Sequence, residues 1–256
     1  MARGDEPADV VVRGGRVLSS FTREWLDADV AIVDGVVAGI GRYDGRETVD
    51  AVGRFVVPGF IDAHMHLESV KLLVDEFARL VLPLGTTAVV ADPHEIANVL
   101  GVDGVHWLLD ASSGLQLEVF FMAPSCVPAS PFESPRRALS TGDLESLMRR
   151  RRVLGLAEMM NFPGVVGGLP SELEKLALEG AAHVDGHAPG LLGKELQAYA
   201  AAGSSPASPG NGSTRTWRSW TVSSPVSAAT TVLRPSTRLG ASSFPASSTR
   251  TCTSSR

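Results

Sequence analysis

The sequence predicts an α/β fold: an incomplete (β/α)8 barrel of about five β/α units, after a small β-sandwich-like unit and before a disordered C-terminal tail. Three observations lead to this prediction. Short apolar segments separated by turn dipeptides fill residues 1–57, and strand-like and helix-like segments alternate over residues 58–202. Residues 203–256 consist mainly of Ser, Thr, Pro, Ala, Gly and Arg without apolar periodicity.

The first 57 residues indicate a small antiparallel β unit. Gly14-Gly15 and Asp34-Gly35 each separate two short apolar segments. Both dipeptides supply the positive φ that a tight hairpin turn requires, so we expect two hairpins. Phe55-Val56-Val57 would close the unit before Pro58-Gly59.

The barrel part alternates between apolar strands and amphipathic helices, which implies a parallel sheet with right-handed crossovers. In such a barrel, the functional side chains lie at the carboxyl ends of the strands, where the polar residues of this sequence fall. The predicted strands cover residues 60–63, 86–91, 117–122, 153–159 and 182–185, and the predicted helices cover residues 72–82, 105–109, 143–149, 171–178 and 194–202.

Charge is distributed unevenly along the chain, whose net charge is −5. All 28 acidic residues and all six histidines precede residue 201. After residue 201, arginine is the only charged residue type in the sequence. An acidic body argues against nucleic acid as a partner, because phosphate binding needs clustered Lys and Arg. We expect the run Arg149–Arg152 to be a solvated helix end.

Nothing in the sequence indicates export or a membrane. The N-terminus has no apolar signal core, and no apolar run approaches the roughly 20 residues of a membrane helix. Cys126 and Cys252 are too few for a disulfide framework, and Cys126 is expected to be a small packed residue. We therefore expect a cytoplasmic protein.

Four side chains are candidate metal ligands. His64 and His66 follow an apolar strand two residues apart, so both would project from one face and chelate one ion. Glu158 ends a later apolar strand, where burial without a cation would be costly, and His187 follows another strand. The alternative for the His-x-His pair alone is two ordinary polar residues at the start of a loop.

Several motifs resemble known families. Pro58–His66 resembles the first-strand signature of the amidohydrolase superfamily, and the β unit before it resembles the split sandwich domain of that superfamily. The similarity is continuous from about residue 3 to about residue 202. Four further segments, in the same order, are similar to the adenine deaminase family: Ala91–Val99, Pro124–Pro128, Gly155–Asn161 and Asp185–Gly190.

The resemblance implies a metallo-dependent hydrolase with a binuclear Mn²⁺ or Fe²⁺ site. His64 and His66 would hold one ion, Glu158 would bridge both, and His187 would bind the second. A metal-bound hydroxide would attack C6 of adenine to give hypoxanthine and ammonia. The partner would be this small-molecule substrate, with no nucleic acid or membrane, and the family allows a homo-oligomer.

Other polar residues have less specific roles. His94 and Glu95 are candidate catalytic residues beside Glu158; the alternative for this pair is a helix start, with Glu95 in the first turn. His106 and His183 are expected to be structural. Four further residues are candidates to contact substrate or to orient the metal ligands: Glu68, Ser69, Asp92 and Asp185. Asp185 would act as a partner of His187. The alternative is that these residues occupy ordinary loop positions.

The chain departs from the family after His187. The resemblance implies a histidine in a Ser-Asp-His-Glu context at the sixth strand and an aspartate near the eighth, but no His or Asp follows His187. We therefore expect open sheet edges, poor solubility and little or no deaminase activity. Two alternatives remain: another amidohydrolase acting on a cyclic amide or purine, or a non-catalytic fragment.

The composition of residues 203–256 suggests a frameshift in a GC-rich gene. Trp217 and Trp220 fit this interpretation, because the codon TGG read one base earlier begins NTG and encodes Leu, Met or Val. The alternative is a natural Ser/Thr-rich segment.

Overall fold

The computed structural model describes residues 6–130, 132–178, 183–204 and 230–233. The chain divides into two compact units, one built mainly around residues 8–61 and the other around residues 62–78 and 88–204. Each unit has its own β-sheet, and the predicted α/β class is confirmed.

The first unit contains a six-stranded sheet with the order β11-β5-β1-β2-β3, in which β4 also pairs with β1. Its core is a cluster of buried β-branched residues that includes Val12, Val30 and Ile32. The strands are β1 (Ala8–Ser19), β2 (Glu24–Val33), β3 (Val36–Gly41), β4 (Gly45–Asp50), β5 (Phe55–Pro58) and β11 (Thr230–Leu233).

The predicted hairpins of this unit are half correct. Strands β2 and β3 form an antiparallel hairpin through Asp34 and Gly35, whose φ angles are 51° and 74°. Gly14-Gly15, however, makes no turn: β1 runs through it, and the pairing with β2 shifts register there. The positive φ of Gly14, 73°, serves a bulge inside one strand instead.

The sheet is also mixed, whereas the sequence predicted an antiparallel unit. Strand β1 is antiparallel to β2 but parallel to both β4 and β5. Glycine dipeptides predict local hairpins, but they carry no information on which strand returns to pair with β1 over a longer loop.

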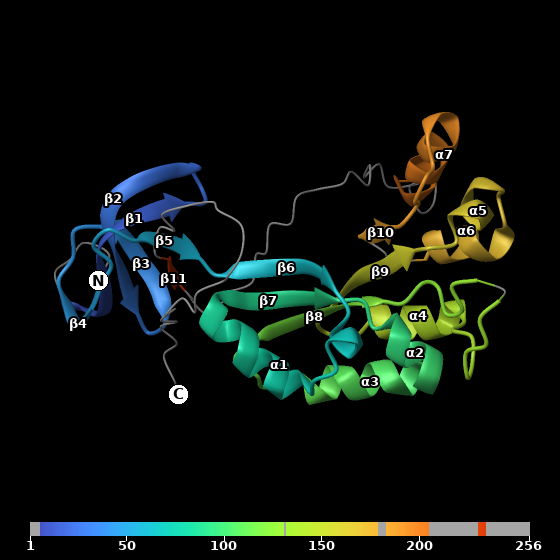
Figure 1. Cartoon of the computed structure of the whole chain (residues 1–256), viewed down its shortest axis with the longest axis horizontal. Coiled ribbons are helices and arrows are strands. Elements are labelled where there is room, and N and C mark those ends of the chain that lie inside the picture. The colour runs from blue at the N-terminus through green and yellow to red at the C-terminus, as the bar shows by residue number, and fades with distance from the viewer. Residues whose placement is uncertain (1–5, 131, 179–182, 205–229, 234–256) are drawn as a thin grey trace, which may run out of the picture. The chain divides into compact units, whose positions relative to one another are not determined.

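The second unit contains the five-stranded sheet β10-β9-β8-β7-β6, in chain order (Figure 1). The pairs β7–β8, β8–β9 and β9–β10 are parallel, which confirms the predicted half-barrel. β7 and β9 have the predicted bounds. The strands are β6 (Phe60–Met65), β7 (Thr86–Ala91), β8 (Glu118–Ala123), β9 (Val153–Met159) and β10 (Val184–Gly186).

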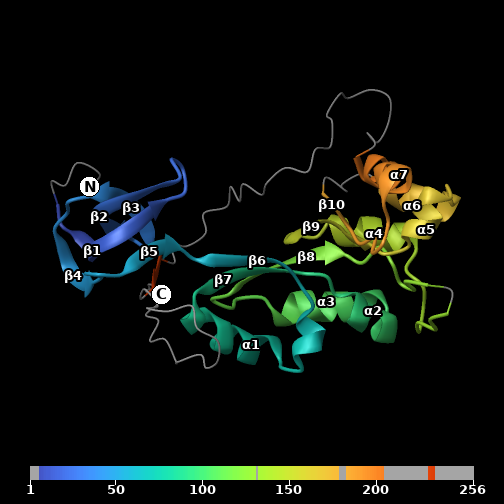
Figure 2. The same cartoon turned by 45° about the horizontal axis from the view of Figure 1, so that its top comes forward.

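Each predicted helix is present, as α1, α3, α4, α6 and α7. The sequence did not predict η1, η2 or α5, and it predicted α2 only as the helix-start alternative for His94 and Glu95. In Figures 1 and 2, α1 and α3 lie on the same face of β6, β7 and β8, and α4 packs against β8 and β9. The helices are η1 (Leu67–Val70), α1 (Val74–Val81), η2 (Leu82–Leu84), α2 (His94–Leu100), α3 (Val102–Ala111), α4 (Thr141–Met148), α5 (Phe162–Val166), α6 (Pro170–Leu176) and α7 (Gly193–Ser204).

The central strands of this sheet are covered on both sides. Phe121 and Leu156 are fully buried, and Val90, Met122 and Ala157 form one cluster across three neighbouring strands. By contrast β6 is an edge strand, and its Phe60 and Ile61 are 44% and 47% exposed. Strands packed on both faces are rigid supports, so side chains at their carboxyl ends have defined positions.

Most of the tail lies outside the described residues, namely 205–229 and 234–256. Thr230–Leu233 form β11, antiparallel to β5, which the sequence pattern did not predict. The frameshift interpretation stays a prediction. Within the described part of the chain, every helix is too short or too polar to cross a bilayer.

Candidate metal centre

The carboxyl ends of the parallel strands supply the predicted ligands. His64 lies near the end of β6, Glu158 is the penultimate residue of β9, and His187 follows β10 directly. Strands β9 and β10 are hydrogen-bonded neighbours, so Glu158 and His187 emerge side by side.

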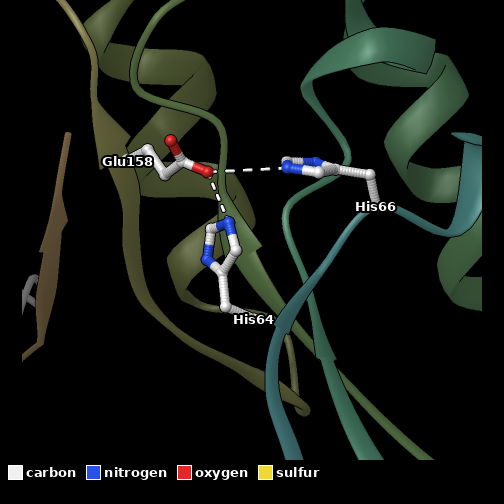
Figure 3. A group of neighbouring side chains, drawn as sticks. All are labelled: His64, His66 and Glu158. Atoms are coloured by element: carbon white, nitrogen blue, oxygen red, sulfur yellow. Dashed lines mark ion pairs between the residues drawn. The ribbon is translucent and has the colours of Figure 1, made fainter. Parts of the chain in front are cut away.

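The three histidines meet at Glu158, which is 8% exposed. Nε2 of His64 contacts Oε1 of Glu158, and Nε2 of His66 lies 3.5 Å from the same oxygen. Figure 3 shows both imidazoles directed at this oxygen. Nδ1 of His187 lies 3.2 Å from the other oxygen, Oε2. The four candidate ligands therefore converge at one point.

This arrangement fits a divalent ion. One ligand atom from each of His64, His66 and Glu158 lies within 4.8 Å of the others. Imidazole nitrogen and carboxylate oxygen are the ligands that Zn²⁺, Mn²⁺ and Fe²⁺ share in proteins. A buried carboxylate that faces imidazole nitrogens needs a proton or a cation between the two groups.

The tautomer of His66 is set by a backbone carbonyl. Its Nδ1 lies 2.9 Å from the carbonyl oxygen of Asp92, which can only accept a hydrogen bond. Nδ1 therefore carries the proton, and Nε2 keeps the lone pair that a metal ion needs. The backbone N–H of Asp92 donates in turn to the carbonyl of Met65, at 2.9 Å, so the end of β7 fixes the end of β6.

Ser125 holds the backbone of Glu158 in place. Its hydroxyl donates to the Glu158 carbonyl oxygen at 2.6 Å. The next residue, Cys126, is 1% exposed, as predicted for a packed thiol, and accepts a hydrogen bond from the backbone N–H of Met160 at 3.2 Å. The sequence motif that contains Ser125 was visible, but its hydroxyl had no predicted role.

Tyr199, on α7, positions His187. Its hydroxyl accepts a hydrogen bond from the His187 N–H at 3.0 Å and donates to the carbonyl of Met159 at 2.6 Å. Burial raises the pKa of Tyr199 to about 12, so the phenol stays protonated. A Cβ at Gly186 would come within 2.8 Å of this hydroxyl, so the close approach requires glycine. No sequence signal marked this tyrosine within the predicted helix.

Asp185 faces a different histidine from the one predicted. Its Oδ2 lies 3.8 Å from Nδ1 of His64, and its Oδ1 lies 2.9 Å from Nε2 of His183. His183 directly precedes β10 and Asp185 lies two residues further on within it, so the two side chains lie on the same side of the chain. Because β10 ends at Gly186, His187 leaves this alternation and turns to Glu158 instead.

Comparison with known proteins identifies the family of this chain. Residues 55–205 match the family model described as "Amidohydrolase family", which covers more than half of the chain. The chain belongs to the amidohydrolase family.

Two curated relatives are adenine deaminases. That of Archaeoglobus fulgidus is 51% identical over 205 residues, which is 80% of this chain and 36% of the relative. Adenine deaminase 2 of Carboxydothermus hydrogenoformans is 47% identical over 203 residues, which is 79% of this chain and 36% of the relative. This amidohydrolase chain thus spans about a third of the length of the curated relatives that it matches. A solved adenine deaminase aligns with 71% of this chain and 52% of its own, at 16% identity and a TM-score of 0.48.

In this amidohydrolase, His94 and Asp92 lie beside the four converging candidate ligands. The rings of His66 and His94 meet edge to face with centroids 4.7 Å apart. Nδ1 of His94 is 3.4 Å from Oδ2 of Asp92, and this carboxylate raises the pKa of His94 more than burial lowers it.

Glu68, Ser69 and Glu95 form a separate network at the start of α2. The hydroxyl of Ser69 donates to Oε1 of Glu95 at 2.7 Å, and the Ile96 N–H donates to Oε1 of Glu68 at 3.1 Å. Burial raises the pKa of Glu68, although the hydrogen bond from Ile96 lowers it. These contacts fit the helix-start alternative for Glu95, and its role as a catalytic residue stays a prediction.

Proposed function

We propose that the chain carries part of the metal centre of an adenine deaminase-type hydrolase, which converts adenine into hypoxanthine and ammonia. The convergence of three imidazoles on the buried carboxylate of Glu158 is the main support. The two relatives described above, both called adenine deaminases, support adenine over other cyclic amides or purines as the substrate.

The proposed metal ligands are His64, His66, Glu158 and His187, and the proposed ions are Mn²⁺ or Fe²⁺. When bound, these ions supply Lewis acidity and make water acidic enough to be a nucleophile at C6 of adenine. Ser125 and Tyr199 keep Glu158 and His187 at fixed positions, which matters because metal ligation tolerates little error in ligand placement.

We assign His94 as the proton donor to the departing amine. It lies against His66, and Asp92 raises its pKa, so the protonated form is more populated near neutral pH than for an ordinary histidine. A group with a pKa near the working pH transfers protons most effectively. Asp92 would then orient His94, while Asp185 orients His64.

The chain itself is expected to be a poor catalyst. No His or Asp follows His187, so the sixth-strand and eighth-strand ligands that the family resemblance implies are not among its residues. A non-catalytic fragment that still binds metal is the second candidate function, favoured by this single observation. The cytoplasmic location and the assembly into a homo-oligomer remain predictions.

A chimera tests the assignment directly. Residues 1–202 are joined to the C-terminal remainder of the Archaeoglobus fulgidus adenine deaminase, and ammonia release is measured with adenine, guanine, cytosine and dihydroorotate. We expect turnover of adenine above the other three, and loss of turnover in the Glu158→Gln chimera. A folded, metal-loaded chimera that prefers another substrate, or that ignores the Glu158→Gln change, would refute the proposal. The 256-residue chain should show little or no turnover in the same assay.

A further inference from the structure

Two hydrogen bonds join η1, which follows β6, to the first turn of α2, which follows β7. The Ile96 N–H donates to Oε1 of Glu68 at 3.1 Å, and the Ser69 hydroxyl donates to Oε1 of Glu95 at 2.7 Å. The two helices also pack against each other. The segment after β6 therefore holds the start of the helix that carries His94.

Helix α2 begins without a cap from its own neighbouring sequence. The residue before it is Pro93, which has no side-chain acceptor and makes no capping hydrogen bond. A helix leaves the N–H groups of its first turn without intrahelical partners, and an N-cap side chain ordinarily accepts from the second or third of them. In α2 the third N–H belongs to Ile96, and its acceptor is Glu68, 28 residues earlier in the chain.

The two carboxylate oxygens of Glu68 have different surroundings. Oε1 accepts from Ile96, whereas Oε2 is buried without a hydrogen bond from the described residues. Burying an unpaired carboxylate oxygen is costly. The bond from Ile96 offsets part of this cost, because it is charge-assisted and lies at the positive end of the helix dipole. The geometry of Glu68 thus fits a cap on α2.

The first residue of α2 is His94, and the place of its ring depends on how the helix starts. The ring lies edge to face against His66, with centroids 4.7 Å apart, and its Nδ1 is 3.4 Å from Oδ2 of Asp92. The second contact is too long for a strong hydrogen bond. Helix ends without a cap fray, and fraying at this end would move His94 away from His66.

We propose that Glu68 is a positioning residue that acts through α2: by capping Ile96, it keeps His94 against His66. The placement of His94 does not depend on the reaction, but its value for proton transfer to the departing amine rests on the proposed function. The cap needs an acceptor oxygen and no negative charge, since an amide oxygen also accepts from an N–H. Glu68→Gln should therefore retain the cap, and Glu68→Ala should lose it.

Nuclear magnetic resonance of the full chain tests the placement without any activity. The wild type should show a nuclear Overhauser effect between the rings of His66 and His94, which are in contact. We expect Glu68→Ala to lose this effect and to exchange the Ile96 amide proton about 10-fold faster, and Glu68→Gln to retain both properties. The matched control is Glu174→Ala, at an exposed position of α6, which should behave as the wild type does.

The amide protons of α3 show whether each variant is folded, and they should exchange as slowly as in the wild type. A folded Glu68→Ala variant that keeps the ring contact and the slow exchange at Ile96 would overturn the inference. So would an equal loss in Glu68→Gln and Glu68→Ala, because an acceptor oxygen would then not be what holds the helix.

The chimera described above separates this role from the proposed function. In it, Glu68→Ala should lower kcat for adenine at least about 10-fold, while KM and bound Mn²⁺ stay unchanged, because His94 would act in proton transfer and not in binding. An active chimera whose kcat is unaffected by Glu68→Ala contradicts the role of Glu68 and leaves the proposed function intact. A chimera without deaminase activity, combined with loss of the ring contact in Glu68→Ala, supports the placement and refutes the proposed function.

Discussion

At the scale of single residues, Tyr199 has the clearest part in positioning the candidate metal ligands. Its hydroxyl joins the backbone of His187 to that of Met159, next to Glu158, so it sets the spacing of two proposed ligands at the ends of neighbouring strands. Groups that orient a metal ligand commonly change metal affinity by about 10-fold to 100-fold when they are removed.

Tyr199→Phe should therefore weaken metal binding with little loss of structure. We expect the midpoint of Mn²⁺ binding in equilibrium dialysis to rise about 10-fold, because His187 loses its backbone anchor but keeps its side chain. Tyr43→Phe, in the other unit, is the matched control and should bind as the wild type does. Equal midpoints for both variants would show that Tyr199 only packs.

At this scale the sequence predicts ligands better than it predicts their supports. His64, His66, Glu158 and His187 each stand at or near the end of an apolar strand, and parallel strands bring such residues to one edge. Ser125 and Tyr199 act through hydrogen bonds to backbone atoms of distant residues, which no spacing rule encodes. The contacts of Asp185 with His64 and His183 were not predicted, because they depend on where β10 ends.

Among the elements, the C-terminal end of helix α3 is joined to β8 by one arginine, Arg152. The Arg152 guanidinium donates to the carbonyl of Leu109, to the hydroxyl of Ser112 at 2.9 Å and to the carbonyl of Val119 at 3.1 Å. It thereby satisfies carbonyls at the C-terminus of α3 and joins them to β8. The sequence predicted a solvated helix end for Arg149–Arg152, which is wrong for Arg152.

Arg152→Lys should destabilise the fold although it keeps the charge. An ammonium cannot reproduce the planar fork that donates to several acceptors at once, so we expect the free energy of unfolding in urea to fall by about 1–3 kcal/mol. Arg151→Lys makes the same substitution at the exposed neighbour and should change the free energy of unfolding little. Equal losses in both variants would contradict the assigned role.

Helix α4 begins with a reciprocal cap. The Ser140 hydroxyl accepts from the Asp143 N–H at 3.2 Å, and the Ser140 N–H donates to Oδ2 of Asp143 at 2.9 Å. Partial burial alone would raise the pKa of Asp143, but hydrogen bonds from Ser140 and Arg137 outweigh it and lower the pKa below the ordinary 3.8. The ionised carboxylate therefore stabilises the folded state above that pH, and the stabilisation is lost as the pH falls through the lowered pKa.

Asp143→Asn should reduce stability at pH 7 by about 0.5–2 kcal/mol. The difference from the wild type should shrink as the pH falls toward 3, because the wild-type carboxylate is then increasingly protonated as well. Urea unfolding of both proteins across this pH range measures it, with Asp103→Asn, in the first turn of α3, as the control. A difference that is independent of pH would contradict the assignment.

Element types were predictable where periodicity is strong. Strands β7 and β9 have the predicted bounds. The apolar run of β7 is followed by Asp92, and that of β9 begins directly after Arg152. The bulge at Gly14-Gly15 was predicted as a turn, because a positive φ serves both structures and only the pairing partner decides between them. The start of α4 came two residues earlier than predicted, because Ser140 rather than the acidic residues begins the cap.

For the molecule as a whole, five parallel strands place their polar ends together without a closed barrel. The described sheet begins at β6 and ends at β10, and these two strands carry His64 and Asp185, which lie 3.8 Å apart. The half-barrel is thus sufficient to bring the candidate ligands together. The pairing of β11 with β5 joins residues far apart in sequence, which is why a short Thr-Thr-Val-Leu segment in a Ser-rich region gave no usable signal.

The central claim is that this half-barrel forms a metal centre around Glu158. The most direct test of this claim is Mn²⁺ binding by the Glu158→Gln variant. Glutamine keeps the shape of the side chain and removes the charge that three histidines share, and Glu118→Gln, at the exposed start of β8, is the control. At equal free Mn²⁺, the account predicts fewer ions bound per chain in Glu158→Gln than in the wild type and the control. The same metal content in all three proteins would contradict it.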